Sequence, residues 1–451
     1  MWQFWFLSLR NLRRNSKRNL ATGCAIAFGF CGILLLQAYA FRVENFLRVH
    51  TLYSLHTGHI VLLADQGFDK FRYNPRKYSL TPEDQRFILN ALKDEAGIEA
   101  VEKQITGQGL LGNGCISLPF IARGLEPAVD KILRAHPQVK EWMPNQKFLK
   151  SGQGLSDSKA GEGLLLSLGL ATALGKTTML GDIPPGAPIT LVDCAAPDVK
   201  EQLKKDSNVQ LLSGTWRGAM SAVDGEAIGI FQTGFQEADN SAILADVALL
   251  QKLFDTENVE RISVWLKDDK KIPELSKKLN EKFAAAGKKY DLVSWNEERL
   301  SPYYFGSKQF LDTLSAFVSM ILAAVIALSV LNSTTMTIME RSQEIGMYRA
   351  MGFRRRQVRR LYLQESLLLS LISLGVGTLL TIAVILAINS ANIVYYPPGV
   401  SNGMVLRFVL NESSAAKAAG MILVLVLLAT FMAVSSRLRQ KPADLLGGTL
   451  R

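Results

Sequence analysis

Four long stretches of the sequence carry no charged residue, and they limit the chain to a membrane fold. They cover residues 21–41, 313–339, 366–388 and 418–436. At a rise of 1.5 Å per residue, the first reaches about 30 Å, the thickness of the hydrocarbon core of a bilayer. The second would reach about 40 Å, so a helix there must tilt or project beyond the membrane. We therefore predict four transmembrane helices.

The distribution of basic residues predicts which side of the membrane each connection faces. Residues 1–20, 340–365 and 437–451 carry five, seven and four Lys or Arg, and residues 389–415 carry one. Because cytoplasmic loops are enriched in Lys and Arg, both termini and the 340–365 loop are predicted to be cytoplasmic, and residues 42–309 to lie outside. A cleaved signal peptide is the alternative for the amino end, but its apolar run is long and no small-residue cleavage site follows.

The large polar region between the first two apolar runs shows both helix and strand signals. Thr81 is a good helix cap, because Pro82 and two acidic residues follow it. Apolar residues alternate in the run that begins at Ile262, which is typical of a strand buried on one face. Strands are expected at 101–105, 262–266 and 290–295, and a second helix at 273–286 that Gly287 ends.

The basic loop between the second and third apolar runs contains a motif. Residues 342–351 have the apolar spacing of a short surface helix, and Gly352 is well placed just past its end. The sequence EIGMYRAMGF, followed by a basic turn and LYLQESLLL, closely resembles the cytoplasmic loop of ABC-transporter permeases of the FtsX/MacB/lipoprotein-releasing type. Tyr348 departs from that pattern, since the family more often has a small aliphatic residue there.

In that family the loop is a coupling helix that docks on a separate ATPase subunit. Carried over by motif position, the resemblance implies that coupling rests on Glu344, Ile345, Gly346, Met347, Arg349, Ala350 and Gly352. The alternative is an ordinary basic loop that only sets topology, with Glu344 and Arg349 as solvated surface charges. Glu365, at the start of the third span, is expected to pair with Arg359 or Arg360 or to face lipid headgroups.

Other segments resemble the same permeases: SLRNLRRNSKRNLAT near the amino end, KPADLLGG in the tail, and residues 161–185, where a helix precedes Gly181-Asp182. The resemblance implies a membrane α-helical fold of four transmembrane helices, with a large α+β extracytoplasmic domain between the first and second spans. The expected division is a 1–20 amino-terminal segment, 21–41 first span, 42–309 periplasmic domain, 310–339 second span and stalk, 340–365 coupling loop, 366–388 third span, 389–415 periplasmic loop, 416–436 fourth span and 437–451 tail. Within the periplasmic domain, a membrane-proximal body (42–124 and 217–309) and a distal lobe (125–216) are expected.

Neither a nucleotide site nor an enzyme is predicted in this chain. The run from Gly169 to Lys176 looks like a phosphate loop, but five residues separate its glycines where that motif needs four. The sequence shows no nucleophile–base constellation and no metal-ligand spacing. We therefore expect a non-catalytic subunit without cofactor, whose partner binds ATP and magnesium. Cys115 and Cys194 both lie in the polar region, and the sequence does not decide whether they form a disulfide.

The lipoprotein-releasing relatives hold acyl chains in a cavity where the first two spans leave the membrane. The corresponding residues are Phe41, Phe46, Phe310, Phe317 and Met320, for which ordinary packing is the alternative. The predicted function is that of a permease subunit that transmits ATP-driven motion to release lipoproteins or another envelope substrate. Alternatives are an FtsX-like regulator of cell-wall hydrolases, a MacB-like efflux component, and a membrane-anchored binding or sensor protein.

The resemblance also implies partners and a location. An ABC ATPase dimer, a second permease, identical or paralogous, and membrane lipids are expected partners, and a lipoprotein substrate and a periplasmic chaperone are left open. The net charge of +11 does not predict nucleic-acid binding, because part of it lies beside the apolar runs. The expected location is the bacterial inner membrane, with several spans.

Overall fold

The computed structural model describes residues 16–144, 148–158, 162–176, 194, 196, 206–235, 237–395 and 404–438. The chain divides into two compact units. The helical unit comprises Met1–Glu44, Gly306–Ile393 and Leu406–Arg451, and the α/β unit comprises Asn45–Phe305 and Val394–Val405. Gly181-Asp182 and the KPADLLGG tail motif lie outside the described residues, as does most of the SLRNLRRNSKRNLAT segment.

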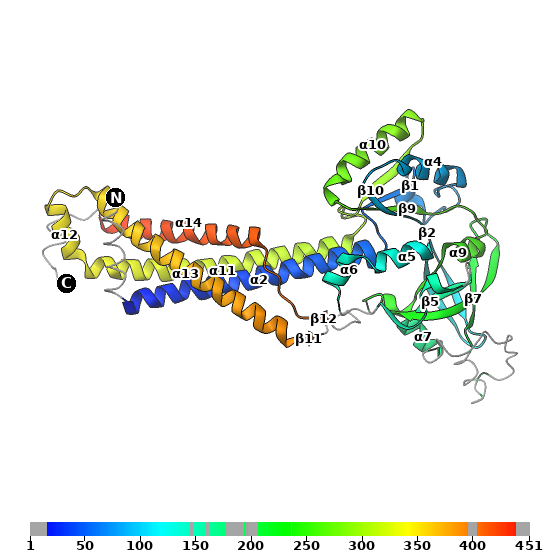
Figure 1. Cartoon of the computed structure of the whole chain (residues 1–451), viewed down its shortest axis with the longest axis horizontal. Coiled ribbons are helices and arrows are strands. Elements are labelled where there is room, and N and C mark those ends of the chain that lie inside the picture. Colours follow the sequence, from blue (N-terminus) through cyan, green and yellow to red (C-terminus); the bar gives the residue numbers. More distant parts are fainter. Residues whose placement is uncertain are drawn as a thin grey trace. The chain divides into compact units, whose positions relative to one another are not determined.

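Four long helices dominate the described part of the helical unit (Figure 1). They are α2 (Ser16–Val49), α11 (Pro302–Glu340), α13 (Arg355–Ala391) and α14 (Glu412–Arg437). Each is long and apolar enough to cross a membrane, as the four uncharged runs predict. A short helix, α12 (Ser342–Ala350), connects α11 to α13. The fold is that of a helical membrane protein with a large additional α/β domain.

A shared apolar core holds the four long helices together. It contains residues from every one of them: Ile26, Phe30, Ile33, Leu34, Ile326, Val330, Leu374, Ala418, Ile422, Val426 and Ala429. Small residues allow the closest approach, as is common between membrane helices. A Cβ atom on Gly377 of α13 would lie 2.8 Å from the backbone oxygen of Ala27 in α2. Side chains of Thr430 and Ser366 also share a 2.9 Å hydrogen bond between α14 and α13.

In the described part of the α/β unit, ten strands form one hydrogen-bonded network. The strands are β1 (Ile60–Ala64), β2 (Ile98–Gly112), β3 (Ser117–Leu125), β4 (Leu149–Gly152), β5 (Gly163–Ser167), β6 (Asn208–Gly214), β7 (Met220–Phe231), β8 (Ala242–Asp246), β9 (Arg261–Leu266) and β10 (Tyr290–Ser294). Two more, β11 (Val394–Tyr395) and β12 (Met404–Val405), form a separate antiparallel pair.

The long strand β2 takes part in two different sheets. Its first half pairs with β9, which continues through β1 to the edge strand β10. Its second half pairs with β3 and β6, and among the described residues the order β2-β3-β8-β5-β7-β6 returns to β2 as a closed ring. This ring combines strands from the expected membrane-proximal body with strands from the expected distal lobe, because β3 and β7 lie almost wholly outside the predicted lobe at 125–216. The division into a body and a lobe with those boundaries stays a prediction.

Shorter helices pack around these strands. They are α3 (Gly67–Lys70), α4 (Pro82–Lys93), α5 (Pro127–Arg134), α6 (Pro137–Trp142), α7 (Leu168–Ala173), α9 (Val247–Phe254) and α10 (Ile272–Ala285). The unit also has a π-helical turn, η1 (His50–Ser54), and the 3-10 turns η2 (Leu155–Asp157), η3 (Ala238–Asn240) and η4 (Asp269–Lys271).

The predicted helix starts and stops are confirmed where the local sequence is strong. At the start of α4, the Thr81 hydroxyl accepts from the Asp84 backbone N–H, and the Asp84 carboxylate accepts from the Thr81 N–H. The expected helix over 273–286 is α10, and Gly287 follows it with a φ of +67°.

The expected strand over 262–266 is present as β9, but its half-buried character is wrong. Ser263 and Trp265, on the other face, are fully buried as well. The reason is that β9 lies between β1 and β2, with other elements covering both of its faces. The indole N–H of Trp265, for example, donates to the backbone oxygen of Leu52 at 2.9 Å.

Two further sequence features have structural roles in this unit. Cys115 and Cys194 form a disulfide, which settles the possibility left open above. Lys176, in the run that looks like a phosphate loop, is buried and donates to the backbone oxygens of Asp206 and Asn208. Burial lowers the pKa of Lys176 to about 8. Its ammonium group therefore fastens the chain before β6.

Candidate functional site

The short helix α12 is anchored to the rest of the helical unit by one face. Ile345 is 2% exposed, and Gly346 beside it is also buried. The apolar cluster around Ile345 takes residues from α11, α13 and the end of α14: Ile338, Val358, Tyr362, Ala433, Val434 and Leu438. Any displacement of α12 therefore acts on three long helices at once, because closely packed side chains move together.

The other face of α12 is open. Met347 is 50% exposed and Met351 is 61% exposed, and Ala350 and Gly352 are exposed as well. Gly352 has a φ of +93°, and a Cβ there would meet nothing within 4 Å, so the glycine serves the backbone turn. Glu344 and Arg349 are partly buried. The seven residues expected to couple thus fall into two inward residues, two at intermediate depth and three outward ones.

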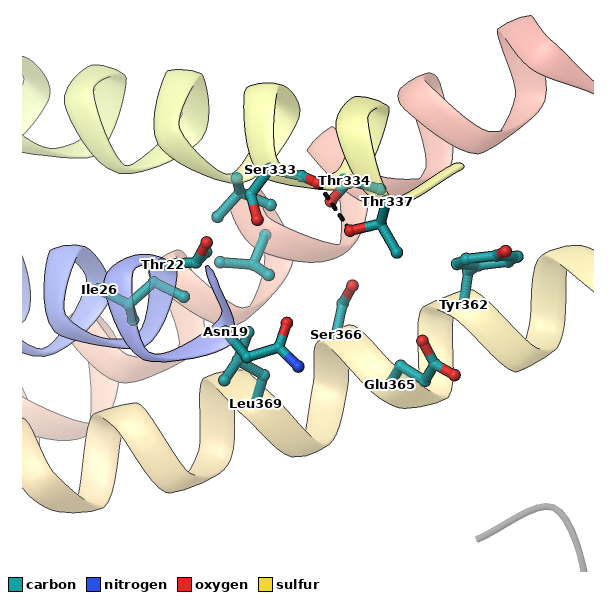
Figure 2. Close-up of a pocket in the computed structure, with 12 residues that line it drawn as sticks. Asn19, Thr22, Ile26, Ser333, Thr334, Thr337, Tyr362, Glu365, Ser366 and Leu369 are labelled. Carbon is teal, nitrogen blue, oxygen red and sulfur yellow. Dashed lines mark hydrogen bonds between the residues drawn. The ribbon is translucent and has the colours of Figure 1, made fainter. Parts of the chain in front are cut away.

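A small polar cavity lies within the helical unit (Figure 2). Its volume is about 40 Å³, enough for a few water molecules. The lining includes Asn19 and the hydroxyls of Thr22, Ser333, Thr334, Thr337 and Ser366. Polar groups are costly inside a membrane, so a cavity lined by hydroxyls and bordered by a carboxylate is a candidate functional feature of the helical unit.

Glu365 borders this cavity and is the principal buried charge there. Its carboxylate lies 3.5 Å from the Arg341 guanidinium, and each side chain is 11% exposed. The predicted pairing of Glu365 with Arg359 or Arg360 is wrong. These arginines precede Glu365 by six and five residues, and that spacing does not bring two side chains to the same face of a helix. The guanidinium of Arg359 instead lies over the ring of Phe431, 4.5 Å from its centroid.

Sequence reasoning could have found the Glu365 pair. Arg341 follows the second span directly and Glu365 starts the third, so two consecutive antiparallel helices bring them to the same end of the bundle. A second ion pair, between Arg18 and Glu340 at 2.5 Å, links α2 to the end of α11. These two pairs flank the connection from α11 into α12.

The five residues expected to hold acyl chains differ in exposure, and their role stays a prediction. Phe310, Phe317 and Met320 are exposed on α11, and Phe41 is half-buried on α2. Phe46 belongs to the α/β unit, where it is 8% exposed and stacks on His50 with ring centroids 6.0 Å apart. None of the five lines the polar cavity.

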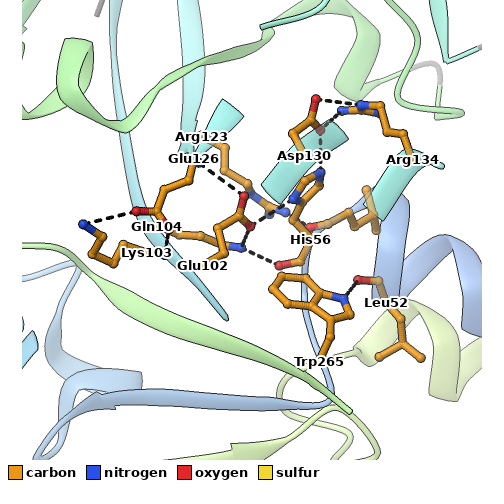
Figure 3. Close-up of polar contacts among 11 residues, drawn as sticks. Leu52, His56, Glu102, Lys103, Gln104, Arg123, Glu126, Asp130, Arg134 and Trp265 are labelled. Atoms are coloured by element: carbon orange, nitrogen blue, oxygen red, sulfur yellow. Dashed lines mark hydrogen bonds and ion pairs between the residues drawn. The ribbon is translucent and has the colours of Figure 1, made fainter. Parts of the chain in front are cut away.

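The α/β unit contains a buried charge network that sequence reasoning missed (Figure 3). His56 is 1% exposed, with its Nδ1 2.9 Å from Glu102 and its Nε2 2.9 Å from Asp130. The Glu102 carboxylate accepts from Nδ1, and a second carboxylate at ion-pair distance from Nε2 favours the protonated imidazole. Arg134 pairs with Asp130 on its other side, and the Gln104 amide donates to Glu102 at 2.6 Å.

The electrostatics of this network favour the charged forms of both His56 and Asp130. Burial by itself lowers the pKa of His56, but the carboxylates of Glu102 and Asp130 outweigh it and raise that pKa above 6.5. Burial favours the neutral form of Asp130, yet Arg134 and His56 hold the pKa of this carboxyl well below 3.8. No local sequence signal predicts the network, because its members come from separate segments of the chain.

Comparison with known proteins finds a family match within the helical unit. Residues 316–442 match the family model of the FtsX-like permease C-terminal domain. The macrolide export ATP-binding/permease protein MacB of Bdellovibrio bacteriovorus is 29% identical over 168 residues, which is 34% of this chain and 25% of that protein. The pyoverdine export ATP-binding/permease protein PvdT of Pseudomonas fluorescens is 26% identical over 167 residues, 36% of this chain and 25% of that protein.

Two solved domains were also found among similar structures. The extracellular domain of the noncanonic ABC-type transporter YknZ from Gram-positive bacteria is 17% identical, with a TM-score of 0.31, and covers 52% of this chain and 100% of that domain. The periplasmic region of MacB from Actinobacillus actinomycetemcomitans is 14% identical, with a TM-score of 0.32, and covers 52% of this chain and 87% of that region.

The aligned part spans a quarter of the length of the curated relatives, 25% in each case. The FtsX-like match begins in α11 and ends just after α14, so it contains α12 and both of its neighbouring helices. The position of the EIGMYRAMGF motif inside this match agrees with the resemblance drawn from the residues themselves. The helical unit therefore carries an FtsX-like permease domain, and the chain is similar to ABC-transporter permeases of the FtsX/MacB superfamily.

Proposed function

We propose that the chain is a non-catalytic permease subunit that passes ATP-driven motion from a separate cytoplasmic ATPase to its α/β unit. The observation that carries this proposal is the two-faced α12. Its inward residue Ile345 packs against three long helices, and its outward residues Met347 and Ala350 are open to a partner. ATP and magnesium would then be bound by the partner subunit.

The proposed orientation places α12 in the cytoplasm and the α/β unit outside it. Two independent features support it. The loop that contains α12 carries seven Arg, as expected of a cytoplasmic loop. The α/β unit contains the Cys115–Cys194 disulfide, and disulfides persist mainly in oxidising compartments outside the cytoplasm. Both termini would be cytoplasmic, in the inner membrane of a bacterium.

Charge reversal on α12 tests the coupling. The complex is purified with the ATPase that accompanies it, and ATP turnover is measured in nanodiscs for wild type, Glu344→Arg and Arg349→Glu. The control is Glu412→Arg, which changes an exposed acid at the far end of α14, about 37 Å along that helix from its last residue. Turnover is expected to fall in the α12 variants alone. Unchanged turnover in both would reduce the loop to a topology signal.

For the substrate, we propose extraction and release of lipoproteins, which rests on the resemblance of the EIGMYRAMGF loop and residues 161–185 to lipoprotein-releasing permeases. MacB-like export is the second candidate, because the named relatives export a macrolide and pyoverdine. A regulator of cell-wall hydrolases is the third. Purification from the native membrane followed by mass spectrometry separates them: acylated protein supports release, and a co-purified hydrolase or a small molecule supports an alternative.

A second permease, identical or paralogous, is a further part of the proposal. The outward face of α11 carries exposed apolar residues, among them Phe310, Phe317 and Leu328, which either lipid or a partner helix would cover. Cysteine substitution at Phe317 followed by oxidation tests the pairing. Cross-linked dimers formed in native membranes are expected, and only monomer at every such position would argue against it. A periplasmic chaperone remains a candidate to be sought in the same purification.

A further inference from the structure

The α/β unit contains a second cavity, separate from the network of His56. Its volume is about 220 Å³, and it lies among the π-helical turn η1, the helix α6 and the residues that follow β7. Apolar and aromatic side chains form much of its lining, including Tyr53, Val139, Met143 and Phe148. A cavity of about 150 Å³ with such a lining is large enough to hold a benzene molecule, so this one has room for a somewhat larger ring system.

One wall of the cavity is held rigidly. The guanidinium of Arg134 lies over the ring of Phe148, 3.2 Å from its centroid. Its Nε donates to Asp130 at 2.9 Å, and Nη2 lies 2.5 Å from the same carboxylate. The cation is therefore already matched by a buried acid, and the Arg–Phe pair presents a flat, preformed surface. A planar ligand fits such a surface better than a flexible chain does.

Two buried side-chain atoms in this lining make no hydrogen bond in the described part of the chain, Arg134 Nη2 and Gln232 Oε1, and of these Nη2 is matched by the Asp130 carboxylate. Gln232 is 8% exposed, and its side-chain oxygen Oε1 is buried and accepts no hydrogen bond. Other polar lining groups are engaged: His50 Nε2 is 3.0 Å from the Thr233 backbone oxygen, and the Ser54 hydroxyl donates to the sulfur of Met143 at 3.6 Å. A buried acceptor without a donor is unfavourable, so the cavity selects for a molecule that brings one.

We propose that this cavity binds a small planar aromatic molecule carrying one N–H or O–H donor, an indole or a phenol, and that Gln232 accepts the hydrogen bond from it. The aromatic ring lies against the Phe148–Arg134 wall. The site is independent of the proposed coupling function, since it uses neither α12 nor the polar cavity between the long helices.

The test uses the full chain in nanodiscs with two probes, indole and 1-methylindole, which differ in the single N–H. Binding is measured by equilibrium dialysis, with empty nanodiscs to subtract partition into lipid. Saturable binding of one indole per chain is expected. Gln232→Leu is expected to weaken indole binding about tenfold, the equivalent of about 1.4 kcal/mol, and to leave 1-methylindole binding unchanged. Val139→Trp, which fills the cavity, is expected to abolish binding of both probes.

A matched variant and a second readout make the result decisive. Gln210→Leu changes an exposed glutamine of the same unit and is expected to bind both probes like wild type. The melting temperature of each variant shows whether it is folded, and Val139→Trp tests the site independently if Gln232→Leu unfolds. The proposal is overturned if wild type shows no saturable binding, if Val139→Trp binds indole like wild type, or if Gln232→Leu weakens both probes equally, as water filling or non-specific partition would predict.

Discussion

Replacing Ile345 with alanine should release α12 from the long helices without altering the face that a partner would contact. The side chain is 2% exposed and lies in the apolar cluster with residues such as Ile338 and Val358. In the locally opened state, α12 leaves this cluster and its side chains enter water. The substitution therefore destabilises the docked state and has little effect on the open one.

The magnitude follows from the atoms removed. Ile345→Ala deletes three carbons, and each buried methylene contributes about 0.8 kcal/mol, which gives about 2.4 kcal/mol before any cavity cost. Measured Ile→Ala changes in packed cores span about 2–5 kcal/mol. Since about 1.4 kcal/mol is a factor of ten in an equilibrium constant, the open population of α12 should rise at least about 50-fold.

Hydrogen exchange with mass spectrometry measures this directly. Peptides covering α12 in the full chain in nanodiscs should exchange at least about 50-fold faster in Ile345→Ala, because the exchange of a locally opening segment follows its open population. The control is Met347→Ala on the same helix, whose side chain is 50% exposed and should alter exchange little. Equal exchange in wild type and Ile345→Ala would refute the anchoring of α12, as would an equal effect of the two substitutions.

Three further predictions concern the buried network, the helix contacts and the disulfide. The pKa of His56 is raised in the folded state, so its stabilising contribution is present below pH 6.5 and is lost as pH rises through the folded pKa. The pKa of Asp130 is lowered, so the contribution of this carboxylate is present above pH 3.8 and is lost on acidification. The melting-temperature gap between wild type and His56→Asn should therefore be widest between about pH 4 and 6.5 and narrow in alkali, and a pH-independent gap would contradict the assignment. Gly377→Leu should lower the melting temperature in nanodiscs, because a Cβ atom there would lie 2.8 Å from the backbone of α2. Gly375→Leu is the control, since a Cβ atom there meets nothing within 4 Å, and it should leave the melting temperature unchanged. Equal effects of the two substitutions would exclude the contact between Gly377 and α2. Cys115→Ser opens a cross-link between residues 79 apart and should destabilise the α/β unit by up to about 4 kcal/mol, as should reduction of the wild type, and thermal unfolding measures both.

The membrane-spanning helices, the start of α4, the position of α10 and the existence of α12 could be predicted from the sequence. These features depend on residues close together in the chain. A long uncharged run has to bury its backbone in helices, and Thr81 caps α4 through the backbone of Asp84 three residues away. The FtsX-like resemblance of the 340–365 loop was equally local, since a motif of about ten residues carried it.

Other features required the tertiary structure. The sequence indicates a helix around Ile345, but only the packing of α11, α13 and α14 decides that this residue faces inward and Met347 outward. The candidate ligand cavity also exists only after folding, as does the burial of the Gln232 side-chain oxygen, which accepts no hydrogen bond from the described residues.

The sequence by itself predicted the four candidate membrane spans found in the described residues and the short helix in the loop between the second and third, because hydropathy and capping act over a few residues. Tertiary structure alone decided the charge partners: Glu365 pairs with Arg341, and His56 lies between Glu102 and Asp130. Glu102 is 46 residues from His56 and Arg341 is 24 residues from Glu365. A charge buried away from water must find an opposite charge or a hydrogen bond, but which one it meets depends on which distant segments fold together.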